Sequence, residues 1–98
     1  MYWATVVYPN KDGAKFDHNY YVNKHIPMAA MILGHGIQVL KGVASQAGPP
    51  AFLCVARIPI NSVEEFTAKM SAEGAALKAD IPNYTNVVPF IEFEEVLL

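Results

Sequence analysis

A histidine lies in an apolar stretch of the chain, where a hydrophobic residue would be expected. His25 falls within DHNYYVNKHIPMAAMIL, residues 17–33, whose apolar residues recur at helical spacing. On a helix with about 100° per residue, His25 shares a face with Tyr21, one turn earlier, and with Val22, Met28 and Ala29. The imidazole is therefore expected between the helix and the layer beneath it. At that place an imidazole can act as a general base or as a proton shuttle.

Two interpretations of His25 remain open. The side chain is either a core histidine that hydrogen-bonds to Tyr21, Thr5 or a backbone carbonyl, or it lines a ligand cavity beside Tyr21. Both require a partner for the imidazole, because an unpaired buried polar group costs about 1–3 kcal/mol. Pro27 removes one backbone hydrogen bond of the helix, so a kink is expected between Asn23 and Pro27. Such a kink is consistent with a cavity beneath the helix.

The other polar residues argue against metal, nucleotide and nucleic-acid chemistry. His18, His25 and His35 form no HxH or HExxH pattern, and Cys54 is the single cysteine. The sequence contains no GxGxxG and no P-loop motif for a nucleotide. Its seven basic and nine acidic residues form no basic cluster, and the net charge is −2. We therefore expect no metal, no cofactor and no nucleic-acid partner.

The composition predicts a single domain, residues 1–98, that associates with itself. Hydrophobic residues make up 53% of the chain and charged residues only 16%, whereas about a quarter of the residues of soluble proteins are charged. No run approaches the roughly 20 apolar residues of a membrane-spanning helix. The N-terminal MYWATVVYP lacks the pattern of a signal peptide. We expect a cytoplasmic protein that buries its excess apolar surface in a homodimer.

Local patterns predict four strands and two helices that position these residues. The expected strands cover residues 2–8, 37–46, 51–60 and 87–96, and the expected helices cover 17–33 and 62–78, the second bent near 71–74. Asp17 caps the first helix, and Asn61 or Ser62 caps the second. The order β-α-β-β-α-β is that of a ferredoxin-like α+β fold, a four-stranded antiparallel sheet with helices on one face.

The strands are apolar on both faces, which predicts how the dimer forms. Residues 2–8 alternate between two largely apolar sets, and residues 51–60 do the same. A sheet with one solvated face would alternate apolar and polar residues, so we expect the two sheets of a dimer to pack face to face. Pro89, inside the last expected strand, cannot donate to a ladder and places that strand at a sheet edge or at a bulge. The usual ferredoxin-like strand order agrees with the edge.

Three stretches of the chain occur together at a familiar spacing. They are VVYPN at 6–10, FDHNYYVNKHIPM at 16–28 and ADIPNYTNVVP at 79–89. Together they resemble the EthD-like family, named for ethyl tert-butyl ether degradation, in the dimeric α+β barrel superfamily. The resemblance implies a dimer formed through the sheets and a small-molecule cavity between helices and sheet in each subunit. Related barrels include cofactor-free monooxygenases, cyclases, isomerases and haem-binding enzymes.

The family motifs match a small set of candidate site residues. Tyr20, Tyr21 and His25 match the first motif, and Asp80, Asn83 and Tyr84 match the last. Asp80 either holds its own turn through nearby amides or orients His25, and Asn83 and Tyr84 are either turn and packing residues or substrate-binding residues.

The leading hypothesis is a small-molecule enzyme, of oxidoreductase, cyclase or isomerase type, that acts without a cofactor on a small apolar oxygenated compound. His25 would be its general base or proton shuttle, Tyr21 and Tyr84 would position a substrate oxygen, and Met28, Asp80 and Asn83 would contact the substrate. The alternative is a non-catalytic binding or accessory protein of an oxygenase-type degradation pathway. Haem binding through His25 is a third hypothesis, weakened by the presence of a single arginine.

Overall fold

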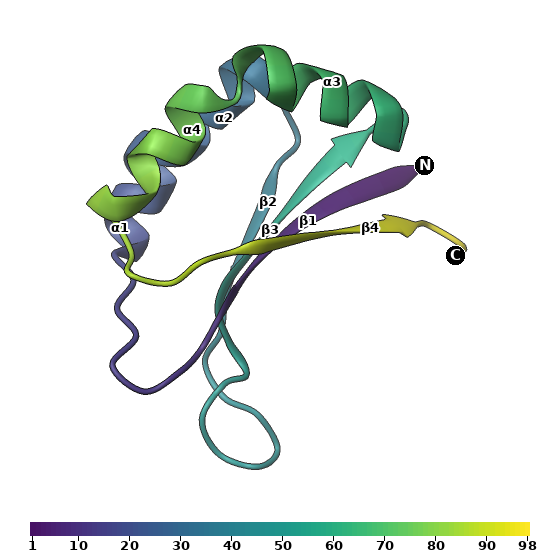
Figure 1. Ribbon diagram of the computed structural model, residues 1–98. Coiled ribbons are helices and arrows are strands. Elements are labelled where there is room, and N and C mark those ends of the chain that lie inside the picture. Colours follow the sequence, from purple (N-terminus) through teal and green to yellow (C-terminus); the bar gives the residue numbers. More distant parts are fainter.

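The computed structural model describes residues 1–98 and arranges them as one antiparallel sheet with helices on one face (Figure 1). The strands are β1 (Tyr2–Pro9), β2 (Gln38–Lys41), β3 (Phe52–Ile60) and β4 (Phe90–Glu95). The helical segments are α1 (His18–Tyr20), the π-helical turn η1 (Tyr21–His25), α2 (Ile26–Leu33), α3 (Val63–Glu73), α4 (Ala75–Asp80) and the 3₁₀ turn η2 (Ile81–Asn83). This confirms the α+β, ferredoxin-like architecture predicted from the sequence.

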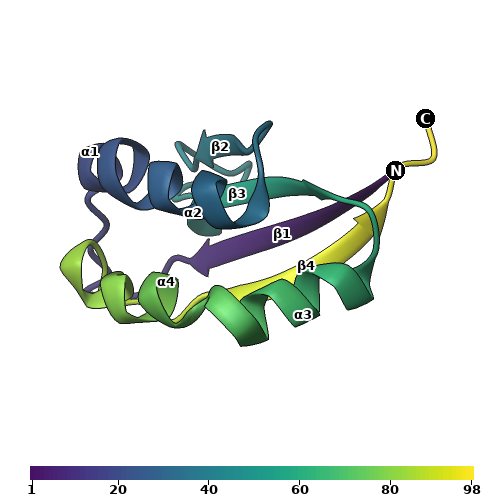
Figure 2. The ribbon, with the colours of Figure 1, turned by 90° about the horizontal axis from the view of Figure 1, so that it is seen from above.

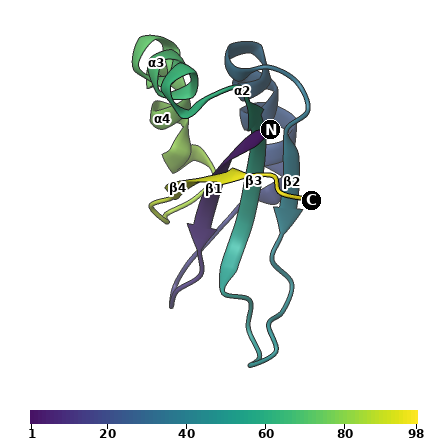
Figure 3. The same ribbon diagram turned by 90° about the vertical axis from the view of Figure 1, so that its right-hand side faces the viewer.

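The sheet has the strand order β2-β3-β1-β4, and each neighbouring pair is antiparallel. As predicted, β4 is an edge strand. Figure 2 shows the helices in two rows, α1 and α2 on the side of β2 and β3, and α3 and α4 on the side of β4. Between β2 and β3 the chain forms a long loop that extends away from the helices (Figure 3). The space above the two central strands is therefore enclosed by both helical rows.

Two strands are shorter than the sequence predicted. The second was expected over 37–46, but β2 ends at Lys41 because residues 42–51 form the long loop, where Ser45 and Gly48 pair with each other. The fourth was expected over 87–96, but β4 begins at Phe90. Pro89 therefore precedes the strand instead of lying inside it, in agreement with its inability to donate to a ladder.

The helix that carries His25 contains a π-helical turn where a kink was predicted. The N–H of Ile26 donates to the carbonyl of Tyr21, five residues earlier. Pro27 follows at once and has no N–H with which to continue the regular ladder. The wider turn changes the angular spacing of its residues, so Val22, expected on the apolar face, is 49% exposed. His25, at the end of the same turn, is buried.

Asp17 caps this helix, as predicted, and its side chain accepts a hydrogen bond from the Tyr20 N–H at 3.0 Å. We expect Asp17→Ala to lower the free energy of unfolding by about 1 kcal/mol, because one N–H of the first turn loses its acceptor. Asp17→Asn should retain most of the stability, since asparagine caps equally well. Urea denaturation of the two variants measures both effects, and an equal loss in both would contradict the capping role.

The second helical row bends near Gly74, as predicted. Ser62 begins α3 by accepting a hydrogen bond from the Glu65 N–H at 3.1 Å. A Cβ on Gly74 would lie 2.5 Å from the carbonyl oxygen of Met70, so a larger residue would force the helix apart. The chain continues into α4, which ends at Asp80 beside the first helical row (Figure 1). No helix of the structure has both the length and the apolar character that crossing a membrane requires.

The sheet face that the helices leave open is more polar than the sequence predicted. Glu92 and Glu94 occupy outward positions of β4, and the Thr5 hydroxyl of β1 donates to Glu94. Arg57 of β3 faces the same way. These charged side chains line a shallow hollow together with apolar ones. The apolar residues are Trp3, Val7, Leu40, Phe52 and Val55.

Candidate functional site

His25 lies on the inner side of the first helical row, at the end of the π-helical turn. It is 6% exposed. Its ring stacks on that of Tyr21, with ring centroids 5.2 Å apart and an interplanar angle of 14°. The imidazole therefore faces the interior between the helices and the sheet, as the helical spacing predicted.

Asp80 lies directly behind the imidazole. Its Oδ2 atom is 2.9 Å from Nδ1 of His25. Its Oδ1 atom accepts hydrogen bonds from the Tyr20 hydroxyl at 2.7 Å and from the Asn83 amide at 3.0 Å. Burial acts to raise the pKa of Asp80, but the hydrogen bonds from Asn83, His25 and Tyr20 outweigh it and hold that pKa below its ordinary value. The side chain is therefore an ionised acceptor at neutral pH.

An ionised carboxylate can only accept a hydrogen bond, so Nδ1 of His25 must carry a proton. In the neutral imidazole this leaves the lone pair on Nε2. The Tyr84 hydroxyl lies 3.4 Å from Nε2, a long hydrogen bond, and 2.7 Å from the Tyr8 hydroxyl. Burial raises the pKa of both phenols, which therefore remain protonated. Nε2 thus carries a lone pair that is engaged by one long hydrogen bond, and it can act as a base.

The imidazole and the Tyr21 ring form part of the wall of a cavity of about 410 Å³ between the helical rows and the sheet. Of its 18 lining residues, 15 are hydrophobic. His25 and Lys78 are the lining residues whose side chains carry a nitrogen. An apolar cavity with one or two polar groups is the usual form of a small-molecule site.

The structure brings most of the sequence-predicted site residues together. Asp80 and Tyr84 contact His25, Tyr21 stacks on it, and Asn83 reaches it only through Asp80. Tyr21 lines the cavity together with His25, whereas Asp80, Asn83 and Tyr84 do not. Met28, expected to contact substrate, is half-buried and does not line the cavity. The turn at 21–25 shifts the angular spacing that had placed it on the inner face.

Sequence reasoning missed two residues of the site. Tyr8 lines the cavity and holds the Tyr84 hydroxyl. Its place two residues after Val6 on the same face of β1, within the motif VVYPN, was the signal that could have found it. Lys78 lines the cavity from α4, and no local pattern distinguished it from a solvated lysine.

The family assignment rests on a match over most of the chain. The model of the EthD domain matches residues 9–87. The chain belongs to the EthD family. A solved EthD-like protein of Ralstonia eutropha JMP134 is 37% identical to this EthD-family chain, with a TM-score of 0.90, and the match covers 99% of this chain and 92% of that one.

Two more distant structures share the fold with this EthD-family protein. An ethyl tert-butyl ether degradation family protein of Bacillus halodurans C-125 is 19% identical, with a TM-score of 0.76 and 99% of each chain covered. A protein of Agrobacterium tumefaciens is 17% identical, with a TM-score of 0.55, covering 97% of this chain and 92% of that one. No curated protein sequence matches the chain.

Replacing Asp80 in this EthD-family protein tests whether its ionisation supports the site. Its pKa is lowered by folding from an ordinary value of 3.8. The ionised form therefore stabilises the fold above that value, and the stabilisation is lost as the pH falls through the lower folded pKa. We expect Asp80→Asn to be less stable than wild type at neutral pH, with a difference that shrinks as the pH falls below 3.8.

Urea denaturation across this pH range measures the difference in the free energy of unfolding. Asn83→Ala, which removes one of the three donors to Asp80, should show a smaller effect with the same pH dependence. A difference between Asp80→Asn and wild type that stays constant from neutral to acidic pH would contradict the proposed role.

Proposed function

We propose that this EthD-family protein binds a small, mostly apolar compound with an oxygen function, and that His25 acts on it as a general base or proton shuttle. The observation that carries the proposal is the placement of the imidazole. It lies in the wall of an apolar cavity, with a carboxylate 2.9 Å from its Nδ1 atom. A histidine oriented by a carboxylate is a common arrangement for moving a proton at neutral pH.

The chemistry that fits this arrangement uses the side chains alone. Nε2 accepts a proton from the bound compound, and the positive charge that develops on the imidazole is stabilised by Asp80. The Tyr84 hydroxyl, once a ligand displaces its long contact with Nε2, donates to the ligand oxygen. The Tyr21 ring stacks on the imidazole and supports its orientation. Reactions that need one proton removed and returned, such as isomerisation or cyclisation, match this set of groups. So does an oxidation in which the substrate, once deprotonated, supplies the electrons and dioxygen accepts them.

A non-catalytic binding or accessory role is the rival proposal, and one observation favours it. Every buried side-chain nitrogen and oxygen already has a hydrogen-bond partner within the protein. A ligand would therefore gain mainly apolar contacts, and the polar network would serve to hold the walls of the cavity. In that case the protein would carry or deliver a compound of an oxygenase-type degradation pathway without converting it.

Screening matched compounds for thermal stabilisation tests the proposal. We expect ketones, lactones, ethers and phenols to raise the melting temperature more than hydrocarbons of the same shape, because only the oxygenated members can pair with the imidazole at the His25 end of the cavity. Each hit is then tested for turnover. Stabilisation without turnover of any hit would favour the accessory role, and equal stabilisation by hydrocarbons would contradict a role for the imidazole in recognition.

We further propose a homodimer in which the open sheet faces pack together, in the cytoplasm. Half-buried Trp3, Val7 and Leu40 on that face support the proposal, since they have no covering layer in the single chain. Arg57 and the nearby glutamates Glu92 and Glu94 are of opposite charge, so two copies related by a twofold axis can pair them across the interface. A single buried thiol, Cys54, is compatible with a reducing compartment.

A further inference from the structure

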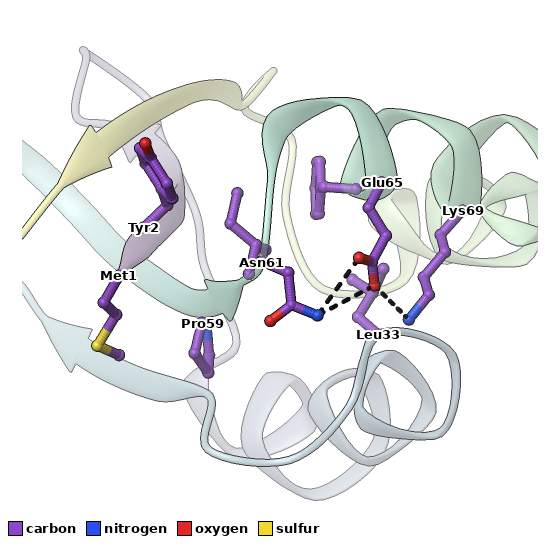
Figure 4. A pocket seen from close by; sticks show the side chains of 9 residues that line it. Met1, Tyr2, Leu33, Pro59, Asn61, Glu65 and Lys69 are labelled. Carbon is purple, nitrogen blue, oxygen red and sulfur yellow. Dashed lines mark hydrogen bonds and ion pairs between the residues drawn. The ribbon is translucent and has the colours of Figure 1, made fainter.

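A second pocket lies at the other end of the space between the helical rows. It has a volume of about 460 Å³. Figure 4 shows Tyr2 and Asn61 at its wall, with Glu65 and Lys69 projecting from α3. We call it the outer pocket, and the cavity lined by His25 the inner cavity.

The two spaces share a wall. Leu33, from the end of α2, and Phe66, from α3, line both the inner cavity and the outer pocket. These side chains come from the two helical rows at the place where α2 and α3 contact each other. Phe66 is 5% exposed. The side chains of Leu33 and Phe66 therefore form part of the partition between the two spaces.

The strands place the two spaces in one line. On the helix-covered face of β3, Ala56 and Ile58 line the inner cavity and Ile60 lines the outer pocket. On β1, Tyr8 lies at the inner end and Tyr2 at the outer end. Tyr8 follows Tyr2 by six positions along the strand, a distance of about 20 Å. The His25 network and the outer pocket thus lie at opposite ends of one groove.

The polar groups of the outer pocket suit an uncharged hydrogen-bonding group. Lys69 lies 3.6 Å from Glu65, so their charges offset each other. The Asn61 amide nitrogen donates to the same carboxylate at 3.3 and 3.5 Å (Figure 4). The Asn61 amide oxygen has no partner within the protein. It can accept a hydrogen bond from a ligand, and the Lys69 ammonium can donate one.

We propose that the inner cavity and the outer pocket are two halves of one elongated ligand site, with Phe66 as the divider. The ligand class is an elongated compound with an apolar body, an oxygen function at the His25 end and an uncharged hydroxyl or carbonyl group at the Asn61 end. The Phe66 ring turns aside when a ligand long enough to pass it is bound. This proposal rests on the proposed function, because it takes the inner cavity as the site of the reactive end.

Two series of probes, matched to each other in chain length, test the proposal when their binding is measured by calorimetry. One series is the straight-chain 1-alkanols from butanol to dodecanol, and the other is the corresponding α,ω-diols. Short diols should bind about tenfold or more weakly than the matching alkanols, because their second hydroxyl is buried in the apolar cavity without a partner. Diols that reach past Phe66 should regain the lost affinity and bind at least as tightly as the alkanols, since their second hydroxyl then contacts Asn61.

Substitutions assign the recovery to the outer pocket. Asn61→Ala and Lys69→Met should weaken the long diols several-fold and leave the short alkanols unchanged. Phe66→Trp, which enlarges the divider, should remove the recovery of the long diols. Asn19→Ala and Lys24→Met, on exposed positions of the first helical row, are the matched controls and should change neither series. Because Asn61 and Lys69 are not core residues, their variants remain informative if Phe66→Trp does not fold.

The outcomes separate this inference from the proposed function. If short alkanols bind and lose affinity in His25→Leu, but diols remain weaker at every length, the inner cavity stands and the elongated site is wrong. Recovery of long diols that persists in Asn61→Ala and Lys69→Met would also overturn it. If no alkanol binds, the proposed function fails and the elongated site fails with it.

Discussion

Replacing His25 with leucine is expected to leave the protein folded and to remove ligand recognition. The groups that the imidazole contacts keep other partners, because Asp80 retains the donors Tyr20 and Asn83, and the Tyr84 hydroxyl retains Tyr8. The free energy of unfolding should therefore fall by less than about 1 kcal/mol, well below the loss that a stranded polar group causes. Any turnover should fall by about a hundredfold to ten-thousandfold, the usual contribution of a general base.

The melting temperature and the response to ligand are measured on the same variant. Leucine fills a similar volume but neither accepts nor donates a proton, so it separates packing from chemistry. His35→Leu, at an exposed position beyond α2, is the matched control and should alter neither quantity. A loss of several degrees in melting temperature, as about 1 kcal/mol or more causes in a domain of this size, together with unchanged ligand binding, would show that His25 is a structural histidine.

The second large effect is expected at the open face of the sheet. Val7 lies on the central strand β1, paired with Val55 of β3 and Phe90 of β4, and is half-buried in the single chain. Val7→Glu would place an unpaired carboxylate from each subunit inside the proposed interface. Burying such a charge costs several kcal/mol, so dimer affinity should fall about a thousandfold or more. Sedimentation should show a dimer for wild type and a monomer for the variant at micromolar concentration.

A matched substitution distinguishes loss of the interface from loss of solubility or stability. Met31→Glu exchanges an apolar side chain that is 89% exposed on α2, in the helical layer and away from the open face. We expect this variant to remain dimeric. A dimer that survives Val7→Glu, or a wild type that is monomeric at micromolar concentration, would contradict the packing of sheet against sheet.

Local patterns predicted the parts of the fold that depend on near neighbours. Two-residue alternation predicted the four strands, and the predicted caps, Asp17 for the first helix and Asn61 or Ser62 for the second, marked where the helices begin. Helical spacing also placed His25 on the buried face. These features depend on hydrogen bonds and side-chain directions within a few residues, which is why a single sequence reveals them.

Contacts between distant segments were harder to predict. Asp80 meets His25 across 55 positions of the chain, and Tyr8 meets Tyr84 across 76. Those contacts depend on the strand order and on the bend at Gly74, neither of which shows in the local pattern around His25. The π-helical turn is intermediate: Pro27 predicted an irregular helix, but the resulting change of spacing at Val22 depends on how the helix settles on the sheet.

The central claim is that Nε2 of His25 faces the ligand while Nδ1 remains bound to Asp80. Nitrogen NMR of protein labelled at histidine tests it, with the resonances assigned through His25→Leu. We predict the Nδ1-protonated tautomer in the free protein, with a large shift of the Nε2 resonance and a small shift of Nδ1 on titration with a stabilising oxygenated compound. An Nε2-protonated tautomer, or ligand binding that leaves both His25 resonances unchanged, would contradict the account.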